Sequence, residues 1–252
     1  AVSGAVPRYL SCGFIIEEGL AMETLEAVVN SMAATAQAAE IAIVTGDTKV
    51  VGRGAADKLF INTAGMGAIP ADIHWGAATL TPGDVLIVSG TLGDHGATIL
   101  NLREQLGLDG ELQSDCAVLT PLIQSLRPID GVKALRDATR GGVNAVAHEF
   151  AATCGYGVEI QEQYLPLKDA VRGVCELLGL DALNFANEGK LVIGVSREAA
   201  DTVLAALRAH PLGADAAIIG EVTERRGVRV AGLYGVKRTL DLPHAEPLPR
   251  IC

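Results

Sequence analysis

Short apolar runs that pass directly into loops rich in glycine, aspartate and threonine recur along this chain. The run 85–89 reads Val-Leu-Ile-Val-Ser, and a glycine-rich loop at 90–96 and a helical pattern from Ala97 follow it. The run 41–44 likewise passes into Thr-Gly-Asp-Thr-Lys. Apolar runs of about four to eight residues between turn signals are typical of buried strands. Such strands mixed with helices predict an α/β (α+β) protein.

Further elements follow from apolar spacing. At 22–39, Leu25, Val28, Val29 and Met32 recur at helical intervals. The first residues, from Ala1, are expected to continue a helix or turn of a chain whose natural N-terminus lies upstream. Turn signals at 81–84 predict domains at 1–81 and 82–240, followed by a tail at 241–252. We expect further helices at 115–126, 142–153, 167–178 and 197–209, and further strands at 58–64, 157–160, 190–196, 216–223 and 227–232.

Composition excludes several classes of protein. The net charge of −10 argues against a nucleic-acid partner, because such binding draws on clustered Lys and Arg. No apolar run approaches the roughly 18 residues of a membrane span, and no signal peptide is visible, so we expect no membrane association. The five cysteines include no Cys-x-x-Cys pair, and their irregular spacing favours a reducing cytoplasm over a disulfide framework.

The segment 45–49 is the first candidate site. Gly46 would permit a sharp turn, and Asp47, with Thr48 beside it, can bind a hard cation through oxygen. Lys49 supplies a positive charge, so the segment suits magnesium and a phosphate chain. An ordinary Asx turn with a solvated lysine explains the same residues equally well.

Two candidate acid–base residues lie in other loops. His95 is in the loop 90–96, whose three glycines allow backbone N–H groups to surround an anion at a helix N-terminus. The loop matches neither the GxxxxGK[ST] nor the GxGxxG pattern, and a histidine bonded within its own turn is the plainer alternative. Glu188, in Asn-Glu-Gly-Lys before a predicted strand, is a candidate base or a solvated turn residue.

The segment 137–142, Asp-Ala-Thr-Arg-Gly-Gly, opens a predicted helix. Asp137 or Thr139 can cap that helix, and Arg140 offers a planar fork of donors. Gly141 and Gly142 allow close approach of a ligand or of another strand. The plainer alternative is a capped helix with a surface arginine.

The chain ends on a cysteine in a proline-rich segment. Three prolines in the twelve residues 241–252 predict extended backbone, which at about 3.3 Å per residue reaches roughly 40 Å. The sulfur of Cys252 could then travel from solvent into a cleft. A frayed end with an incidental cysteine is the alternative, whereas prenylation is excluded because its cysteine lies fourth from the end.

These segments occur in one order, which is more specific than any of them alone. They are Thr-Gly-Asp-Thr-Lys-Val-Val from 45, Gly-Asp-His-Gly from 93, Asp-Ala-Thr-Arg-Gly-Gly from 137, Ala-Asn-Glu-Gly-Lys from 186 and the terminal Pro-Arg-Ile-Cys. Together they closely resemble the HypE family of hydrogenase expression/formation proteins, in the aminoimidazole-ribonucleotide-synthetase-like (PurM-like) superfamily. The resemblance runs from residue 1 to residue 252, and the Pro-Arg-Ile-Cys ending is peculiar to HypE.

The resemblance implies a two-domain PurM-like fold that forms a homodimer through its first domain and binds ATP there. It implies that Cys252 receives a carbamoyl group from the carbamoyltransferase HypF. The family then uses ATP to dehydrate the thiocarboxamide to a thiocyanate. The cyano group passes to a HypC–HypD complex and on to the iron of nickel–iron hydrogenases.

Residue roles follow from the resemblance and from the chemistry of dehydration. Asp47 suits Mg²⁺, Lys49 the phosphates or the tail, and Glu188 proton removal, with His95 as the second candidate. The remaining residues expected to bind ATP are Gly46, Thr48, Arg140, Gly141 and Gly142. The family's glycine-rich segment and the acidic residue expected just before Ala1 are absent, so the resemblance implies that a form truly lacking them is inactive.

Three other functions remain open at this point. The chain could be a non-enzymatic thiol carrier that presents Cys252 to partners. It could be another enzyme of the superfamily acting on a small molecule, where a terminal cysteine has no use. A copper or nickel chaperone would rest on His244 and Cys252 alone, which are too few ligands for a closed site.

Overall fold

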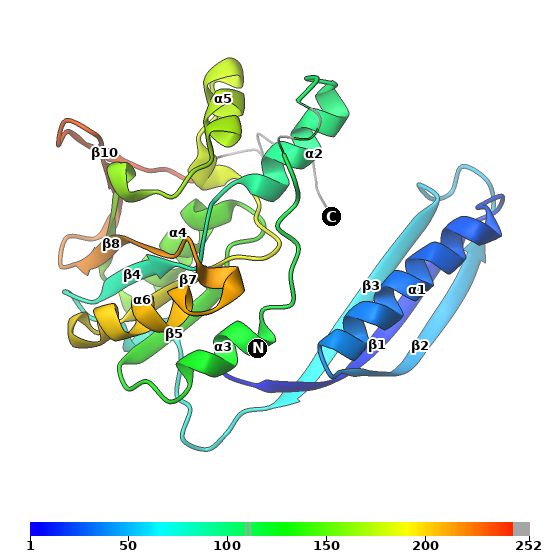
Figure 1. The fold of residues 1–252 in the computed structure, drawn as a ribbon, viewed down its shortest axis with the longest axis horizontal. Helices are drawn as coiled ribbons and strands as arrows, with labels where there is room; N and C mark the ends of the chain where they lie inside the picture. Colours follow the sequence, from blue (N-terminus) through cyan, green and yellow to red (C-terminus); the bar gives the residue numbers. More distant parts are fainter. Residues whose placement is uncertain (109, 111, 244–252) are drawn as a thin grey trace. The chain divides into compact units, whose positions relative to one another are not determined.

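A computed structural model describes residues 1–108, 110 and 112–243 and divides them into two compact units (Figure 1). The first unit contains Ala5–Ala71 together with Ala1, and the second contains Val2–Gly4 and the chain from Asp72 onward. The predicted boundary after residue 81 therefore differs from this division, because Leu80 is only 1% exposed and packs in the core of the second unit. Both units mix helices with strands, which confirms the α/β fold class.

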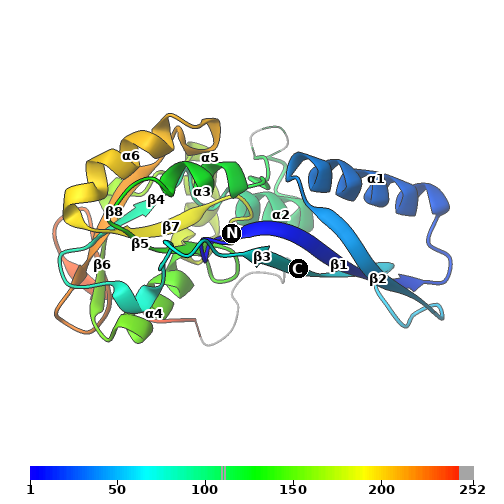
Figure 2. The same ribbon diagram turned by 90° about the horizontal axis from the view of Figure 1, so that it is seen from below.

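The first unit is a three-stranded sheet with one helix. Its strand order is β2-β1-β3, with β1 parallel to β2 and antiparallel to β3. The helix α1 connects the two parallel strands, as a parallel pair requires, and lies along the sheet (Figures 1 and 2). The elements are β1 (Val6–Glu17), α1 (Met22–Ala38), β2 (Ala42–Val51) and β3 (Leu59–Ala68).

The chain opens with a turn at residues 2–3, one of the two expectations for its first residues. The strand that follows, β1, was not predicted, although it is the central strand of this unit's sheet. Period-two alternation puts Cys12 on the face covered by α1, where it is 5% exposed. The opposite face carries Tyr9 and Ile15 of β1 beside their β3 partners Met66 and Phe60. We call these four residues the open face, since each is between 43% and 70% exposed.

The second unit is a seven-stranded sheet with strand order β10-β9-β6-β8-β4-β7-β5. Figure 2 shows α3 and α6 on one side of this sheet and α4 on the other. Its strands are β4 (Val85–Val88), β5 (Val132–Asp137), β6 (Gly157–Gln161), β7 (Leu191–Val195), β8 (Ala217–Thr223), β9 (Gly227–Ala231) and β10 (Lys237–Thr239). Its α-helices are α2 (Asp94–Glu104), α3 (Thr120–Leu126), α4 (Gly142–Cys154), α5 (Asp169–Leu178) and α6 (Ala200–Arg208). Single 3₁₀ turns are η1 (Ala77–Thr79), η2 (Glu162–Tyr164), η3 (Ala182–Asn184), η4 (Arg197–Ala199) and η5 (Pro211–Gly213).

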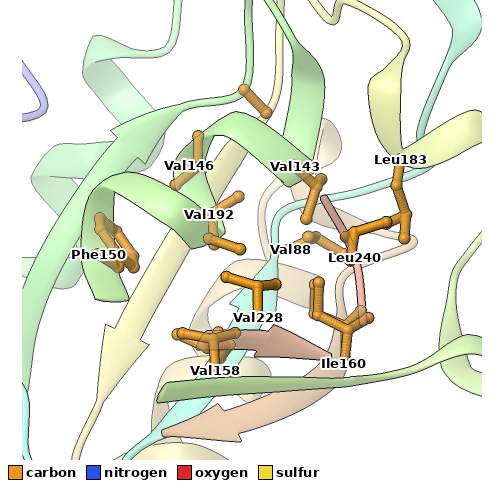
Figure 3. Close-up of a cluster of buried hydrophobic side chains, with 14 of the residues drawn as sticks. Val88, Val143, Val146, Phe150, Val158, Ile160, Leu183, Val192, Val228 and Leu240 are labelled. Carbon is orange, nitrogen blue, oxygen red and sulfur yellow. The ribbon is translucent and has the colours of Figure 1, made fainter. Parts of the chain in front are cut away.

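Strand β4 is apolar at every position because both of its faces are buried. Leu86 and Val88 point into the cluster beneath α4, whereas Val85 and Ile87 point into the cluster beneath α3 and α6. Figure 3 shows Val88 beside Val143 of α4. Because both faces of the strand are covered, all four side chains are at most 4% exposed.

Two predicted helices begin elsewhere. The helix predicted from Ala97 begins at Asp94, and the helix predicted at 115–126 begins at Thr120. Residues 115–119 instead form a loop, and Asp115 of this loop contacts Glu188 in the segment that leads into β7. Strands β5 and β10 were not predicted from the sequence. Within the described part of the chain, no helix combines the length and the apolar character that crossing a membrane requires.

Candidate functional site

The first candidate segment, 45–49, lies within a strand and not at a turn. Residues 42–51 form one continuous strand, β2, whose register pairs Gly46 with Cys12, Asp47 with Gly13 and Lys49 with Ile15. A Cβ on Gly46 would lie 2.1 Å from the backbone oxygen of Cys12. The predicted turn at Gly46 is therefore wrong, and the glycine instead permits close contact between neighbouring strands.

Asp47 and Lys49 lie on the same side of the sheet as the open face. Lys49 pairs with Ile15 of that face, and Asp47 lies two residues earlier on the same strand, where side chains point to the same side. Both side chains are exposed, as is Thr48. The carboxylate of Asp47 accepts a hydrogen bond from the backbone N–H of Thr48 at 2.9 Å. An exposed carboxylate beside an exposed lysine is a suitable pair for a metal-bound phosphate chain.

Three loops of the second unit meet at one end of its sheet. They follow β4, follow β5 and precede β7. Because β7 is antiparallel to both β4 and β5, its beginning lies beside the ends of the other two strands. The loops carry the predicted candidates His95, Arg140 with Gly141 and Gly142, and Glu188. The fold thus brings together residues from three separate sequence motifs.

Asn187 connects these loops and was not singled out by the sequence analysis. Its side chain is 1% exposed, accepts from the backbone N–H of Gly93 at 2.8 Å and donates to the backbone oxygens of Ala138 and Phe185 at 3.0 Å each. A buried amide with all three contacts satisfied fixes the loops relative to one another. In the sequence Asn187 is followed by Glu-Gly-Lys, so nothing local distinguishes it from a solvated turn residue.

The glycine pair serves the packing of this region. Gly142 has φ of +58°, and a Cβ there would lie 2.5 Å from the backbone oxygens of Leu183 and Phe185. Gly142 therefore permits close approach to the 3₁₀ turn η3 and the residue after it, and not to the strand that was predicted. The predicted cap is wrong, because Gly141 is the N-cap residue of α4 and no side chain bonds there. Asp137 instead accepts from Thr139 at 2.8 Å.

Glu188 lies half-buried where the loops meet. Burial raises the pKa of its carboxyl group above the ordinary value, and the negative charges of Asp115 and Asp137 raise it further. His95 and Arg140 act in the opposite direction on the pKa of Glu188. A carboxyl group with a raised pKa is better matched to accepting a proton near neutral pH.

His95 lies buried at the start of α2 and does not bond within its own turn. Its Nδ1 is 2.8 Å from Oγ of Ser114, nineteen residues further along the chain. Its Nε2 is buried and has no hydrogen-bond partner among the described residues. Arg140, in contrast, is exposed.

A cavity of about 320 Å³ lies beside these loops in the second unit. Its walls carry two ion pairs, Asp94 with Lys168 at 3.0 Å and Asp115 with Lys190 at 3.4 Å. None of these four residues was selected from the sequence. Asp115 was missed because its segment was predicted to be helical, whereas it is a loop.

The last described segment is anchored to α4. Leu240 is 4% exposed and lies in the cluster of Figure 3, and its backbone oxygen accepts from Nε2 of His148 at 2.8 Å. The backbone oxygen of Asp241 accepts from Nδ2 of Asn144 at 3.1 Å. The predicted tail site, Cys252, and His244 lie outside the described residues.

The described residues contain no group of three or more His, Cys, Asp or Glu side chains that could bind a metal by themselves.

Comparison with known families and curated proteins gives a consistent result. Residues 1–69 match the AIR synthase related protein N-terminal domain, and residues 81–232 match the corresponding C-terminal domain. Carbamoyl dehydratase HypE of Escherichia coli K12 is 84% identical over 252 residues, covering all of this chain and 75% of that protein. Carbamoyl dehydratase HypE of Rhodobacter capsulatus is 49% identical, with 100% and 75% covered.

Solved structures show the same similarity. A crystal structure of E. coli HypE has a TM-score of 0.99 at 84% identity, covering 100% of this chain and 78% of that one. A HypE structure in complex with ATP has a TM-score of 0.95 at 43% identity, covering 100% and 77%. The structure of a HypE–HypF complex has a TM-score of 0.93 at 42% identity, covering 96% and 80%. The fold, the domain matches and the identity over the whole of this chain together show that it belongs to the HypE family of AIR synthase related proteins.

Proposed function

We propose that this chain dehydrates an S-carbamoyl group on its own Cys252 to a thiocyanate, using ATP, and so supplies the cyanide ligands of nickel–iron hydrogenase. The observation that carries the proposal is Glu188, a half-buried carboxyl group with a raised pKa where three loops meet. The similarity to curated proteins of E. coli and R. capsulatus that are named carbamoyl dehydratase supports the same reaction.

The reaction removes one oxygen and two hydrogens from S–C(=O)–NH₂. ATP, when bound, supplies a phosphoryl group with which the oxygen leaves as phosphate. The carbamoyl nitrogen must lose both of its hydrogens as the C≡N bond forms, so the protein has to accept protons at that nitrogen. Glu188 is the residue we assign to this task, and His95, whose Nε2 has no hydrogen-bond partner among the described residues, is the second candidate.

The residues present fit a bound nucleotide and its magnesium. In the first unit, Asp47 would bind Mg²⁺ and Lys49 would contact phosphate oxygens or the tail, with Gly46 and Thr48 beside them. In the second unit, the exposed Arg140 would offer donors to an anion beside Gly141 and Gly142 at the start of α4, where the N–H of Gly142 donates to the backbone oxygen of Thr139 at 3.0 Å. The structure of a HypE with ATP supports the nucleotide assignment.

We propose three kinds of partner. The carbamoyltransferase HypF would load Cys252, which the structure of a HypE–HypF complex supports. A HypC–HypD complex would accept the cyano group. A second copy of the chain would cover the apolar side chains of the open face, forming a homodimer through the domain 1–81. The domain 82–240 would then carry the three loops around Glu188, and the tail 241–252 would carry the modified Cys252. We place these steps in the cytoplasm, where cysteines stay reduced.

Mass spectrometry of the full-length protein, incubated with its carbamoylating partner with and without ATP, tests the proposal. Carbamoylated protein should lose the mass of one water only when ATP is present, and Cys252→Ala should show neither modification while it stays folded. Thiocyanate formation by the Cys252→Ala variant would refute the role of this residue.

The competing function of a thiol carrier makes a different prediction for Asp47→Ala. An enzyme should lose ATP hydrolysis when the proposed magnesium ligand is removed, whereas a carrier hydrolyses no ATP in either form. Thr45→Ala, a nearby change on the same strand without a charged ligand, is the matched control and should retain hydrolysis.

A further inference from the structure

We propose that Asp115 is a positioning residue for Glu188. Asp115 binds the backbone of Glu188 and, together with Lys190, sets the charge around the Glu188 side chain. The inference rests on the proposed function of Glu188 as the proton acceptor. Asp115 itself touches no reacting atom in this assignment and acts through Glu188.

The contact between the two segments is direct. One carboxylate oxygen of Asp115 accepts from the backbone N–H of Glu188 at 3.0 Å. A Cβ on the next residue, Gly189, would lie only 1.8 Å from the backbone oxygen of Asp115, so the two backbones are in contact. Any side chain at 189 would push the segments apart, and Glu188 would move with its segment.

The charge on Asp115 is almost completely buried. Its side chain is 3% exposed, and Lys190, at 3.4 Å, is 12% exposed. The second carboxylate oxygen is the one that faces Nζ of Lys190 in this ion pair, and it is buried and accepts no hydrogen bond from the described residues. A buried carboxylate is costly even when it is paired, so replacing both members by apolar residues would often stabilise a protein. A functional role is a reason to retain such a pair beside a candidate base.

Several charged groups surround Glu188 on different elements. Asp115 in the loop and Asp137 at the end of β5 raise the pKa of Glu188, whereas His95 on α2 and Arg140 before α4 lower it. Asp137 forms an ion pair with Arg136 at 2.9 Å, as Asp115 does with Lys190 at 3.4 Å. Asp115 differs from all of these because it combines a charge effect with a hydrogen bond to the backbone of Glu188.

Two substitutions separate these contributions. Asp115→Asn keeps an oxygen that can accept from Glu188 but removes the charge, so the acid limb of the rate–pH profile should move to lower pH while the plateau changes only a few-fold. Asp115→Ala removes both, so the plateau rate should also fall by about tenfold to a hundredfold through misplacement of Glu188. Asp215→Asn, a change at an exposed acid on the same cavity, is the control and should behave as wild type.

The measurements are the rate of water loss from the carbamoylated full-length protein across pH and an NMR titration of the Glu188 carboxyl carbon without the substrate. The titration should show a lower pKa of Glu188 in Asp115→Asn and no change in Asp215→Asn. An unchanged titration and an unchanged profile in Asp115→Asn would overturn the inference, as would equal shifts in the two variants. Wild-type rates in Glu188→Gln would instead overturn the proposed function, so the two failures are distinguishable.

Discussion

The two units of this protein bury their apolar residues in opposite ways. All four residues of β4 in the second unit are at most 4% exposed, because helices cover both sides of the sheet. In the first unit, every residue of β2 except Val51 is exposed, and α1 has no buried residue. A sheet covered on both faces can stabilise itself, whereas one with an apolar open face gains stability from a further surface.

The largest difference is expected for matched isoleucines in the two units. Ile87→Ala removes a side chain that is 0% exposed and should lower the free energy of unfolding by about 2–5 kcal/mol. Ile61→Ala removes one that is 41% exposed and should cost less than about 1 kcal/mol in the monomer. Urea unfolding of both variants measures this, and equal losses would contradict the comparison.

An intermediate effect is expected on the open face. Phe60→Glu puts a charge where the proposed homodimer buries an aromatic ring, so the dimer should weaken by at least the roughly 1.5–3 kcal/mol that burial of a phenylalanine contributes. Analytical ultracentrifugation measures the dissociation constant. Val29→Glu, at a residue that is 44% exposed on α1, is the matched control, and the proposed interface is wrong if only the control dissociates.

The smallest effect concerns two glutamates with opposite pKa shifts. Hydrogen bonds from the backbone N–H groups of Gly54 and Lys58 lower the pKa of Glu17 in the first unit, whereas burial raises the pKa of Glu188 in the second. Glu17 therefore contributes stability above its unfolded pKa that is lost as pH falls through its folded pKa. The contribution of Glu188 is present below its unfolded pKa and is lost as pH rises through its folded pKa.

Thermal unfolding across pH tests the two signs. Glu17→Gln should lower the melting temperature at pH 7, with the difference vanishing in acid. Glu188→Gln should raise it at pH 7, and that difference should also vanish in acid, since both side chains are then uncharged. Differences of the same sign would show that one of the two environments is misassigned.

The fold was most predictable where a pattern had one physical cause. The run 85–89 was predicted as a strand because it is apolar at each position, and β4 is buried on both faces. The helix predicted at 22–39 matches α1, since Leu25, Val28 and Met32 recur at helical spacing. In β1, Ser11 and Gly13 interrupt the apolar run, and the pattern of a half-exposed strand was missed.

The site was less predictable, because its contacts join distant residues. Gly46 with Asp47 is a turn signal in isolation, but pairing with β1 at Cys12 keeps the segment extended. Asn187 contacts Gly93 across 94 residues and Asp115 contacts Glu188 across 73, and no local spacing encodes such pairs. The motif residues themselves could be selected from the sequence, whereas the residues that orient them could not.

The attachment of Leu240 and Asp241 to α4 sets a radius for the proposed chemistry. Eleven residues, 242–252, follow this anchor, and a fully extended chain of that length spans at most roughly 36–40 Å. Every group that reacts with the sulfur of Cys252, whether it donates a carbamoyl group or accepts a cyano group, must therefore come within that distance of one fixed point on α4. Inserting residues after Asp241 would enlarge this sphere. Deleting residues there would shrink it, and the partner whose reacting group lies farthest from α4 would be excluded first.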